Sequence, residues 1–113
     1  MKTHVFTLDL KDDPDLIAKY KQYHSAVWPE VIEGIKKIGL IHNRIYLLGN
    51  RLVMILDTED TFDPDHDLVG YTDKPRAKEW DELMKTFQEP LPWAKPGEYW
   101  LRMDLVFDLD QYI

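Results

Sequence analysis

The segment Ile41–Thr58, IHNRIYLLGNRLVMILDT, contains the pattern from which the fold follows. Its two halves, Ile41–Leu48 and Arg51–Thr58, have the composition of β-strands and are separated only by Gly49-Asn50. A two-residue turn that contains glycine closes a β-hairpin well, because its backbone twist matches that of the flanking strands. The sequence therefore predicts an antiparallel pair of strands in the middle of the chain.

The chain before this hairpin predicts one strand followed by helix. Alternating residues in His4–Leu10 indicate a strand. Asp13 before Pro14 is typical of a helix start, since aspartate caps the free amides and proline fits the first helical position. Trp28-Pro29 either kinks this helix or divides it in two, because the residue before a proline avoids helical angles. Gly39 is the predicted stop.

The chain after the hairpin predicts a second helix and a last strand. An acidic connection runs through Asp67, and apolar residues then recur at helical spacing from Asp73 to Phe87. A proline-rich loop precedes a predicted strand at Tyr99–Leu109. The resulting β-α-β-β-α-β order predicts an α+β, ferredoxin-like fold, with an antiparallel sheet and the helices on one face. We expect residues 1–113 to form a single domain.

Composition excludes several classes of function. The net charge of −7 argues against nucleic acid, which needs a basic surface. The chain has no cysteine, and its longest apolar run, Leu52–Leu56, is too short to cross a membrane. No run of signal-peptide length precedes Asp9. We therefore expect a cytoplasmic protein that acts on neither membranes nor nucleic acids.

The sequence contains no complete motif for a metal site, a catalytic nucleophile or a phosphate-binding loop. Asp63–Asp67 begins like a calcium loop, but Leu68 and Lys74 stand where such a loop needs glycine and glutamate. The histidines lack metal-ligand spacing, and Ser25, the only serine, points away from the adjacent imidazole on a helix. There is no glycine-rich phosphate loop. We expect no metal and no cofactor.

Tyr20 and His24 are the strongest candidates for chemistry. They lie four residues apart and therefore share one face of the predicted helix. A buried tyrosine beside a satisfied core histidine explains this spacing equally well. Histidine, however, is the side chain best suited to accept and return a proton at neutral pH. Trp80 on the second helix would cover the same sheet face, and an indole beside acid–base groups suits a sugar.

The motif Y-x-x-x-H-x-x-x-W-P-E, Tyr20 to Glu30, resembles the L-rhamnose mutarotase family over essentially the whole chain. The resemblance continues in Gly39–Leu47, which ends in I-Y-L, and in the W-x-x-L-M pattern of Asp73–Met84. The segment FQEPLPWAKPGEYW, Phe87 to Trp100, is similar to a subgroup of that family. The family implies a ferredoxin-like dimer with an α/β-barrel-like assembly, which interconverts the α and β anomers of a 6-deoxy hexose without metal or cofactor.

The resemblance also implies roles for individual residues. His24 matches the catalytic proton donor, Tyr20 a substrate-binding tyrosine, and Trp80 the first of two tryptophans that pack on the sugar. Asp81 stands in place of the second tryptophan, and Asn43 in place of a substrate-contacting tyrosine. Both replacements are polar, so Asp81 and Asn43 become candidate partners for sugar hydroxyls.

Other functions stay open at this stage. L-rhamnose is the first expectation for the monosaccharide substrate, and L-fucose is the alternative. The fold would also suit a cofactor-free monooxygenase or a sugar-binding module without turnover. Aromatic residues near the C-terminus predict a homodimer interface, although the proline-rich loop could instead fold back on its own chain; they are Trp93, Tyr99, Trp100 and Tyr112.

Overall fold

The computed structural model describes residues 1–112 and has an α+β architecture. The first strand, the hairpin and the helices come in the order that the sequence predicts, and the first helical region is divided in two. Two short strands end the sheet, and the second of them lies within the predicted last strand. The elements are β1 (Lys2–Leu10), α1 (Pro14–His24), α2 (Pro29–Lys37), β2 (Leu40–Leu48), β3 (Arg51–Thr58), α3 (Pro75–Lys85), β4 (Gln88–Glu89) and β5 (Leu101–Arg102). Short 3-10 helices occupy Leu68–Thr72 and Leu109–Tyr112.

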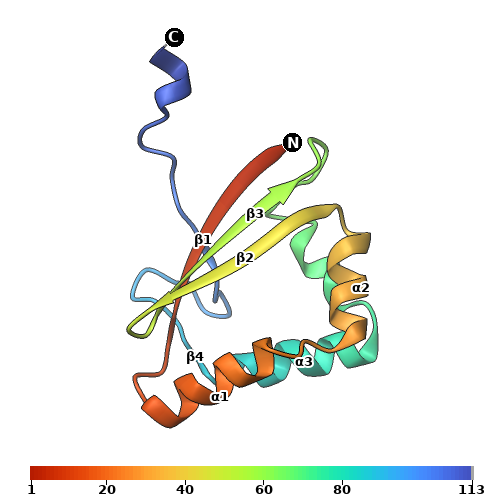
Figure 1. The fold of residues 1–113 in the computed structure, drawn as a ribbon, viewed down its shortest axis with the longest axis vertical. Helices are drawn as coiled ribbons and strands as arrows, with labels where there is room; N and C mark the ends of the chain where they lie inside the picture. The colour runs from red at the N-terminus through yellow and green to blue at the C-terminus, as the bar shows by residue number, and fades with distance from the viewer. Residues whose placement is uncertain (113) are drawn as a thin grey trace.

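The sheet is antiparallel and carries the helices on one side (Figure 1). Its strand order is β2-β3-β1-β4, and β5 also pairs with β1. The predicted hairpin is present as β2 and β3, and Gly49 turns the chain with a φ of 61° that glycine adopts without strain. The expected ferredoxin-like fold is therefore confirmed.

Local signals explain where the first helices begin and end. Asp13 caps α1 by accepting a hydrogen bond from the amide of Asp15 at 2.9 Å. Trp28 is extended, with a ψ of 137°, so Pro29 starts a second helix and does not merely kink the first. Gly39 follows α2 with a φ of 98°, as the predicted stop requires. This division leaves His24 in the last turn of α1.

The core lies between the helices and one face of the sheet. Alternate residues of β1 and β3 point to this face and are buried, namely Phe6, Leu8, Leu10, Leu52, Met54 and Leu56. Tyr20 from α1 and Trp80 from α3 belong to the same core and are each 4% exposed. Both residues that the sequence singles out thus face inward, toward the sheet.

The last predicted strand, Tyr99–Leu109, is wrong over most of its length. Only Leu101–Arg102 form a strand, paired with β1. Beyond it the chain leaves the sheet and extends away from the body of the molecule (Figure 1). Leu105 is 74% exposed and Phe107 is 65% exposed. Alternation alone does not make a strand, because a strand also needs backbone hydrogen bonds to a neighbour; after the Met103 amide donates to the Val5 carbonyl at 2.7 Å, the chain turns away from β1.

None of the helices within residues 1–112 combines the length and the apolar character that a membrane span would need.

Candidate active site

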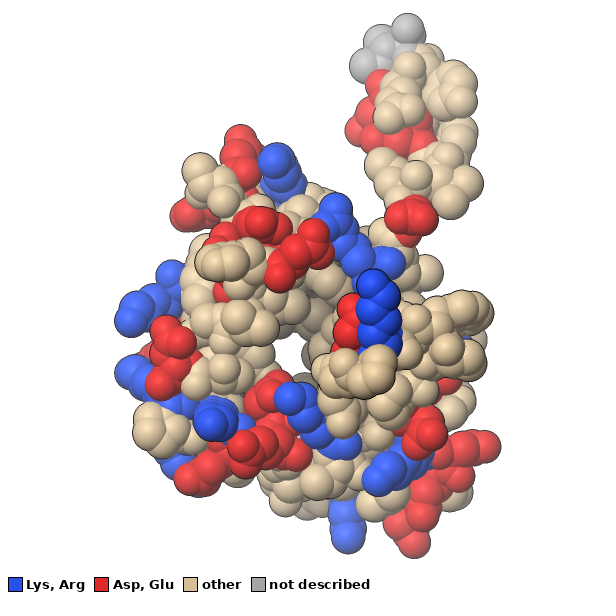
Figure 2. All heavy atoms as spheres, turned by 180° about the vertical axis from the view of Figure 1, so that it is seen from behind, with Lys and Arg blue, Asp and Glu red and all other residues tan. Residues whose placement is uncertain are grey.

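A cavity of about 880 Å³ lies between the sheet and the helices. Seen from behind, the molecule shows an opening between these two layers (Figure 2). The volume is in the range of pockets that bind small molecules. All five candidate site residues predicted from the sequence line this cavity, namely Tyr20, His24, Asn43, Trp80 and Asp81.

His24 is held in one orientation by its own helix. Its Nδ1 lies 2.8 Å from the backbone carbonyl oxygen of Tyr20. A carbonyl oxygen only accepts hydrogen bonds, so Nδ1 must carry the proton that is donated. The neutral ring therefore keeps Nε2 as a free acceptor. Burial lowers the pKa of His24 below 6.5, and the bond to the Tyr20 carbonyl opposes this effect.

Aromatic rings surround the His24 imidazole. The ring of Tyr20 lies 4.3 Å from it between centroids, and Trp80 meets it edge-on at 5.4 Å. Trp28 packs against Trp80 at 5.2 Å, and the Arg76 guanidinium stacks 3.9 Å above Trp28. These contacts fix Trp80 from two sides, which favours a single ring orientation in the pocket.

Tyr20 lines the cavity and is buried. Burial raises the pKa of Tyr20 to about 12, and a hydrogen bond with the Gln88 side chain acts in the opposite direction. The hydroxyl therefore stays protonated at neutral pH. It can donate or accept a hydrogen bond, but it cannot act there as a phenolate base.

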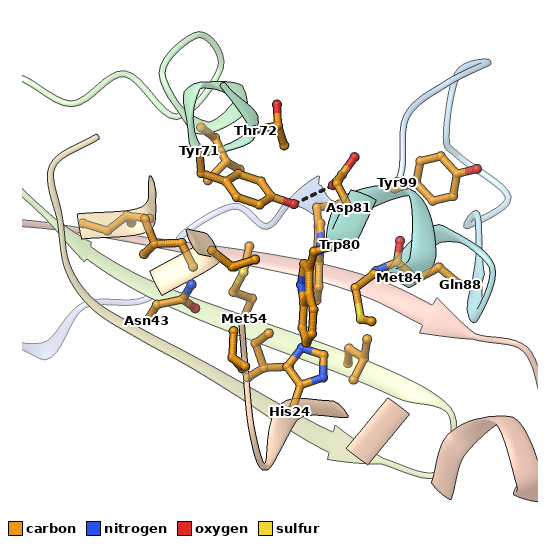
Figure 3. Close-up of a pocket in the computed structure, with 18 of the residues that line it drawn as sticks. His24, Asn43, Met54, Tyr71, Thr72, Trp80, Asp81, Met84, Gln88 and Tyr99 are labelled. Atoms are coloured by element: carbon orange, nitrogen blue, oxygen red, sulfur yellow. Dashed lines mark hydrogen bonds between the residues drawn. The ribbon is translucent and has the colours of Figure 1, made fainter. Parts of the chain in front are cut away.

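Asn43 and Asp81 lie on different walls. Asn43 comes from β2, where it pairs with Leu56. Asp81 follows Trp80 on α3 and accepts a hydrogen bond from the Tyr71 hydroxyl at 2.5 Å (Figure 3). Its other carboxylate oxygen lies 3.0 Å from Nζ of Lys85. The structure thus brings Tyr20, His24 and Trp80 into contact and surrounds Asp81 with polar partners.

Sequence reasoning did not identify Tyr71, Lys85 and Gln88 as residues of the cavity. Tyr71 lies in the 3-10 helix Leu68–Thr72, between the acidic connection predicted through Asp67 and the helix predicted from Asp73. Lys85 carried a usable signal, since it stands four residues after Asp81 on one helix. Within residues 1–112, no group of three or more potential metal-ligating side chains is arranged around a common point.

The fold and the pocket together define a class of protein. It is a ferredoxin-like α+β protein whose cavity combines a neutral imidazole, an indole wall and paired charged groups. Such a lining suits a small ligand with both an apolar face and several hydroxyls.

Comparison with known proteins identifies the family. Residues 3–109 match the family model for L-rhamnose mutarotase. An L-fucose mutarotase from Xanthomonas campestris is 36% identical to this chain, and the match spans 100% of this chain and 92% of the relative. A UPF0734 protein from Dictyostelium discoideum is 44% identical over 98% of this chain and 92% of its own. The chain belongs to the L-rhamnose mutarotase family and is a carbohydrate isomerase, an aldose mutarotase.

Solved structures agree on the fold. The crystal structure of an L-rhamnose mutarotase from Formosa agariphila superposes with a TM-score of 0.68, at 19% identity, over 96% of this chain and 98% of the other. A polyketide cyclase from Streptomyces glaucescens, tetracenomycin F2 cyclase, superposes with a TM-score of 0.59 at 13% identity. Proteins with different activities share this scaffold, so the fold alone does not define the chemistry.

Proposed function

We propose that the protein interconverts the α and β anomers of a 6-deoxy hexose, without metal or cofactor, and that His24 transfers the proton. The observation that carries this proposal is the unprotonated Nε2 of a neutral imidazole, in a cavity walled by the indole of Trp80. In mutarotation the C1–O5 bond breaks and re-forms, and the catalyst need only move protons between the anomeric hydroxyl and the ring oxygen. A positioned acid–base group accelerates such a step by about 10²- to 10⁴-fold.

The tautomer of His24 sets the order of proton transfers. Nε2 first accepts the proton of the anomeric hydroxyl, and the imidazolium then donates it to the ring oxygen. As the C1–O5 bond breaks, C1=O1 forms, and rotation about C1–C2 presents the other face of the aldehyde. Ring closure reverses both proton transfers and leaves His24 neutral. A lowered pKa suits this sequence, because it makes the imidazolium a strong acid toward the ring oxygen.

The remaining predicted residues are proposed to bind the sugar. Tyr20 holds the imidazole through its carbonyl and packs along it, so its hydroxyl would contact the sugar only near the anomeric centre. Trp80, which is 4% exposed, supplies an apolar contact for the sugar through the part of its side chain that lines the cavity. Asn43 from the sheet and Asp81 from α3 are the proposed partners for hydroxyls.

Two sugars are candidates for the substrate. We place L-fucose first, because the L-fucose mutarotase of Xanthomonas campestris is 36% identical over the whole chain. An L-rhamnose mutarotase from Mannheimia succiniciproducens is 28% identical over 73% of it. L-rhamnose, which the sequence motifs favour, remains the second candidate. Both are 6-deoxy hexoses that differ in configuration at C2 and C4.

Anomer exchange followed by NMR tests this function. The exchange rates of L-fucose and L-rhamnose are measured by magnetization transfer with and without the enzyme, and we expect acceleration with L-fucose above that with L-rhamnose. Acceleration of neither sugar would contradict the proposal. Saturable binding without acceleration would indicate a sugar-binding module, and oxygen consumption with an electron-rich aromatic compound would indicate a monooxygenase.

We also propose that the protein is a homodimer. The segment after β5 carries large apolar side chains in solvent, among them Val106, which is 93% exposed, and Tyr112, which is 72% exposed. Trp93 is 74% exposed, whereas Tyr99 and Trp100 fold back and line the cavity. Burial of the exposed side chains by a second copy would remove a surface that favours association. A monomer mass in light scattering at micromolar concentration would contradict this proposal.

A further inference from the structure

We propose that Tyr71, Asp81 and Lys85 form a site that binds the hydroxyl on C4 of the sugar and so determines which 6-deoxy hexose is turned over. This inference rests on the proposed function and extends it to substrate selection. We call these three residues the hydroxyl site. It combines a residue from the 3-10 helix Leu68–Thr72 with two residues one turn apart on α3.

The hydrogen bonds within the hydroxyl site leave capacity for a ligand. The Tyr71 hydroxyl donates to one oxygen of Asp81 at 2.5 Å, and Lys85 Nζ lies 3.0 Å from the other oxygen. Each carboxylate oxygen retains a lone pair, and the ammonium retains two further N–H donors. A sugar hydroxyl can therefore donate to Asp81 and accept from Lys85 at the same time.

The electrostatics of the hydroxyl site suit a neutral ligand. The carboxylate of Asp81 and the ammonium of Lys85 balance each other, and their side chains are 29% and 42% exposed. Burial and the neighbouring Asp81 raise the pKa of Tyr71, so its hydroxyl remains protonated and continues to donate. Charge-assisted hydrogen bonds from such a pair are stronger than bonds between neutral groups.

The position of the hydroxyl site points to C4. In Figure 3 the indole of Trp80 lies between His24 on one side and the Tyr71–Asp81 pair on the other. A pyranose bound along this wall of the cavity with C1 and O5 toward His24 directs the opposite side of its ring, C3 and C4, toward Asp81. L-fucose carries an axial hydroxyl at C4 and L-rhamnose an equatorial one. The hydroxyl site is therefore placed to distinguish them.

The fold fixes Tyr71 through a close backbone contact. A Cβ atom at Gly34 on α2 would lie 2.5 Å from the backbone oxygen of Tyr71, which is closer than real Cβ atoms approach. Only glycine at this position lets the 3-10 helix pack so tightly on α2. Tyr71 is thus held by two helices, through its backbone at α2 and through its hydroxyl at α3.

Combined changes in sugar and protein test the inference. L-fucose is compared with its 4-deoxy and 2-deoxy analogues in the wild-type enzyme and in Asp81→Asn, with Glu79→Gln as the matched control. Glu79 lies on the same helix, pairs with Arg76 and does not line the cavity. If L-rhamnose is turned over faster, its analogues replace those of L-fucose. The readouts are kcat/KM for anomer exchange and the sugar Kd from tryptophan fluorescence.

Loss of the 4-hydroxyl is expected to cost the wild type and Glu79→Gln about 10- to 100-fold in kcat/KM or in Kd. Asp81→Asn should weaken the parent sugar, and its penalty for loss of the 4-hydroxyl should be clearly smaller than that of the wild type, because the amide oxygen of Asn accepts a weaker hydrogen bond than a carboxylate. Loss of the 2-hydroxyl should change kcat/KM and Kd by the same factor in the wild type, Asp81→Asn and Glu79→Gln.

An undiminished 4-deoxy penalty in Asp81→Asn would overturn the inference, as would a wild-type enzyme that is indifferent to the 4-hydroxyl. If the wild type binds sugar but gives no exchange, the proposed function fails while the Kd values still test the hydroxyl site. Should Asp81→Asn fail to fold, Tyr71→Phe and Lys85→Met are used in its place, and a smaller penalty for loss of the 4-hydroxyl is expected in each.

Discussion

The two sides of the Trp80 indole differ in how they are built. The His24 side is assembled from one helix, is lined by aromatic rings and holds a neutral imidazole whose pKa is lowered by burial. The Asp81 side joins two helical segments, reaches solvent and holds an ion pair. A poorly hydrated side suits proton transfer, and a charged, solvated side suits the binding of hydroxyls. The pocket therefore separates chemistry from selectivity.

Among the changes that test the difference between the two sides, replacement of His24 should have the largest effect on the rate of anomer exchange. His24→Ala removes the proposed proton carrier, so anomer exchange should fall by about 10²- to 10⁴-fold. NMR magnetization transfer measures the rate, and sugar Kd should change much less because the Asp81 side is intact. His66→Ala, in the exposed acidic loop, is the matched control. An unchanged exchange rate in folded His24→Ala would remove His24 from the mechanism.

Gly34→Ala is expected to disturb only the Asp81 side of the pocket, through Tyr71. Helix propensity by itself would make this change stabilising by up to about 1 kcal/mol. The contact with the Tyr71 backbone reverses the sign, and overpacking should lower the free energy of unfolding by about 1–3 kcal/mol. Urea unfolding measures this, and the penalty for the 4-deoxy sugar should shrink while exchange on the 4-deoxy sugar itself persists. A variant more stable than the wild type would refute the tight contact.

The pH dependence reports on the His24 side. Because burial lowers the pKa of His24, the base form should persist below pH 6.5, and the acid limb of kcat/KM should have its midpoint there. Below that midpoint the rate should fall about tenfold per pH unit. Stability follows the same sign, since the unfolded chain takes up this proton first and the free energy of unfolding drops as pH falls through that window. A midpoint above 6.5 would contradict the buried neutral imidazole.

Tyr20→Phe should give the smallest effect. The carbonyl that orients His24 belongs to the backbone and survives, as does the ring that packs on the imidazole. Loss of the hydroxyl should therefore slow exchange by less than about tenfold. Tyr23→Phe, on the same helix but outside this cavity, is the control and should leave the rate unchanged. A loss as large as that of His24→Ala would mean that the Tyr20 hydroxyl takes part in proton transfer.

Local patterns were sufficient for much of the fold and for one side of the pocket. The Gly49-Asn50 turn, the cap at Asp13 and the stop at Gly39 each act over a few residues, and the structure contains all three. Tyr20 and His24 share a face simply because they stand one turn apart. That same spacing places Nδ1 of His24 against the carbonyl of Tyr20.

The last predicted strand failed because strand formation is not a local property. The alternation from Leu101 to Phe107 is real, but a strand exists only where the backbone hydrogen-bonds to a neighbouring strand. β4 pairs with Asp9–Leu10 of β1 and β5 with Phe6–Thr7; the Met103 amide still donates to the Val5 carbonyl, and the chain then leaves the sheet although its register points along β1. Periodicity in the sequence does not report where the chain leaves its neighbour.

The sequence by itself determined the hairpin, the helix boundaries set by proline and glycine, and the Tyr20–His24 pair, because each depends on contacts between near neighbours in the chain. On the other side of the pocket the sequence indicated Asp81 and its helical neighbour Lys85, whereas tertiary structure alone decided that Tyr71 joins them. Tyr71 reaches Asp81 from ten residues away only because Gly34 lets one helical segment approach another. Such an approach depends on the free space between packed backbones, which no short-range pattern of side chains encodes.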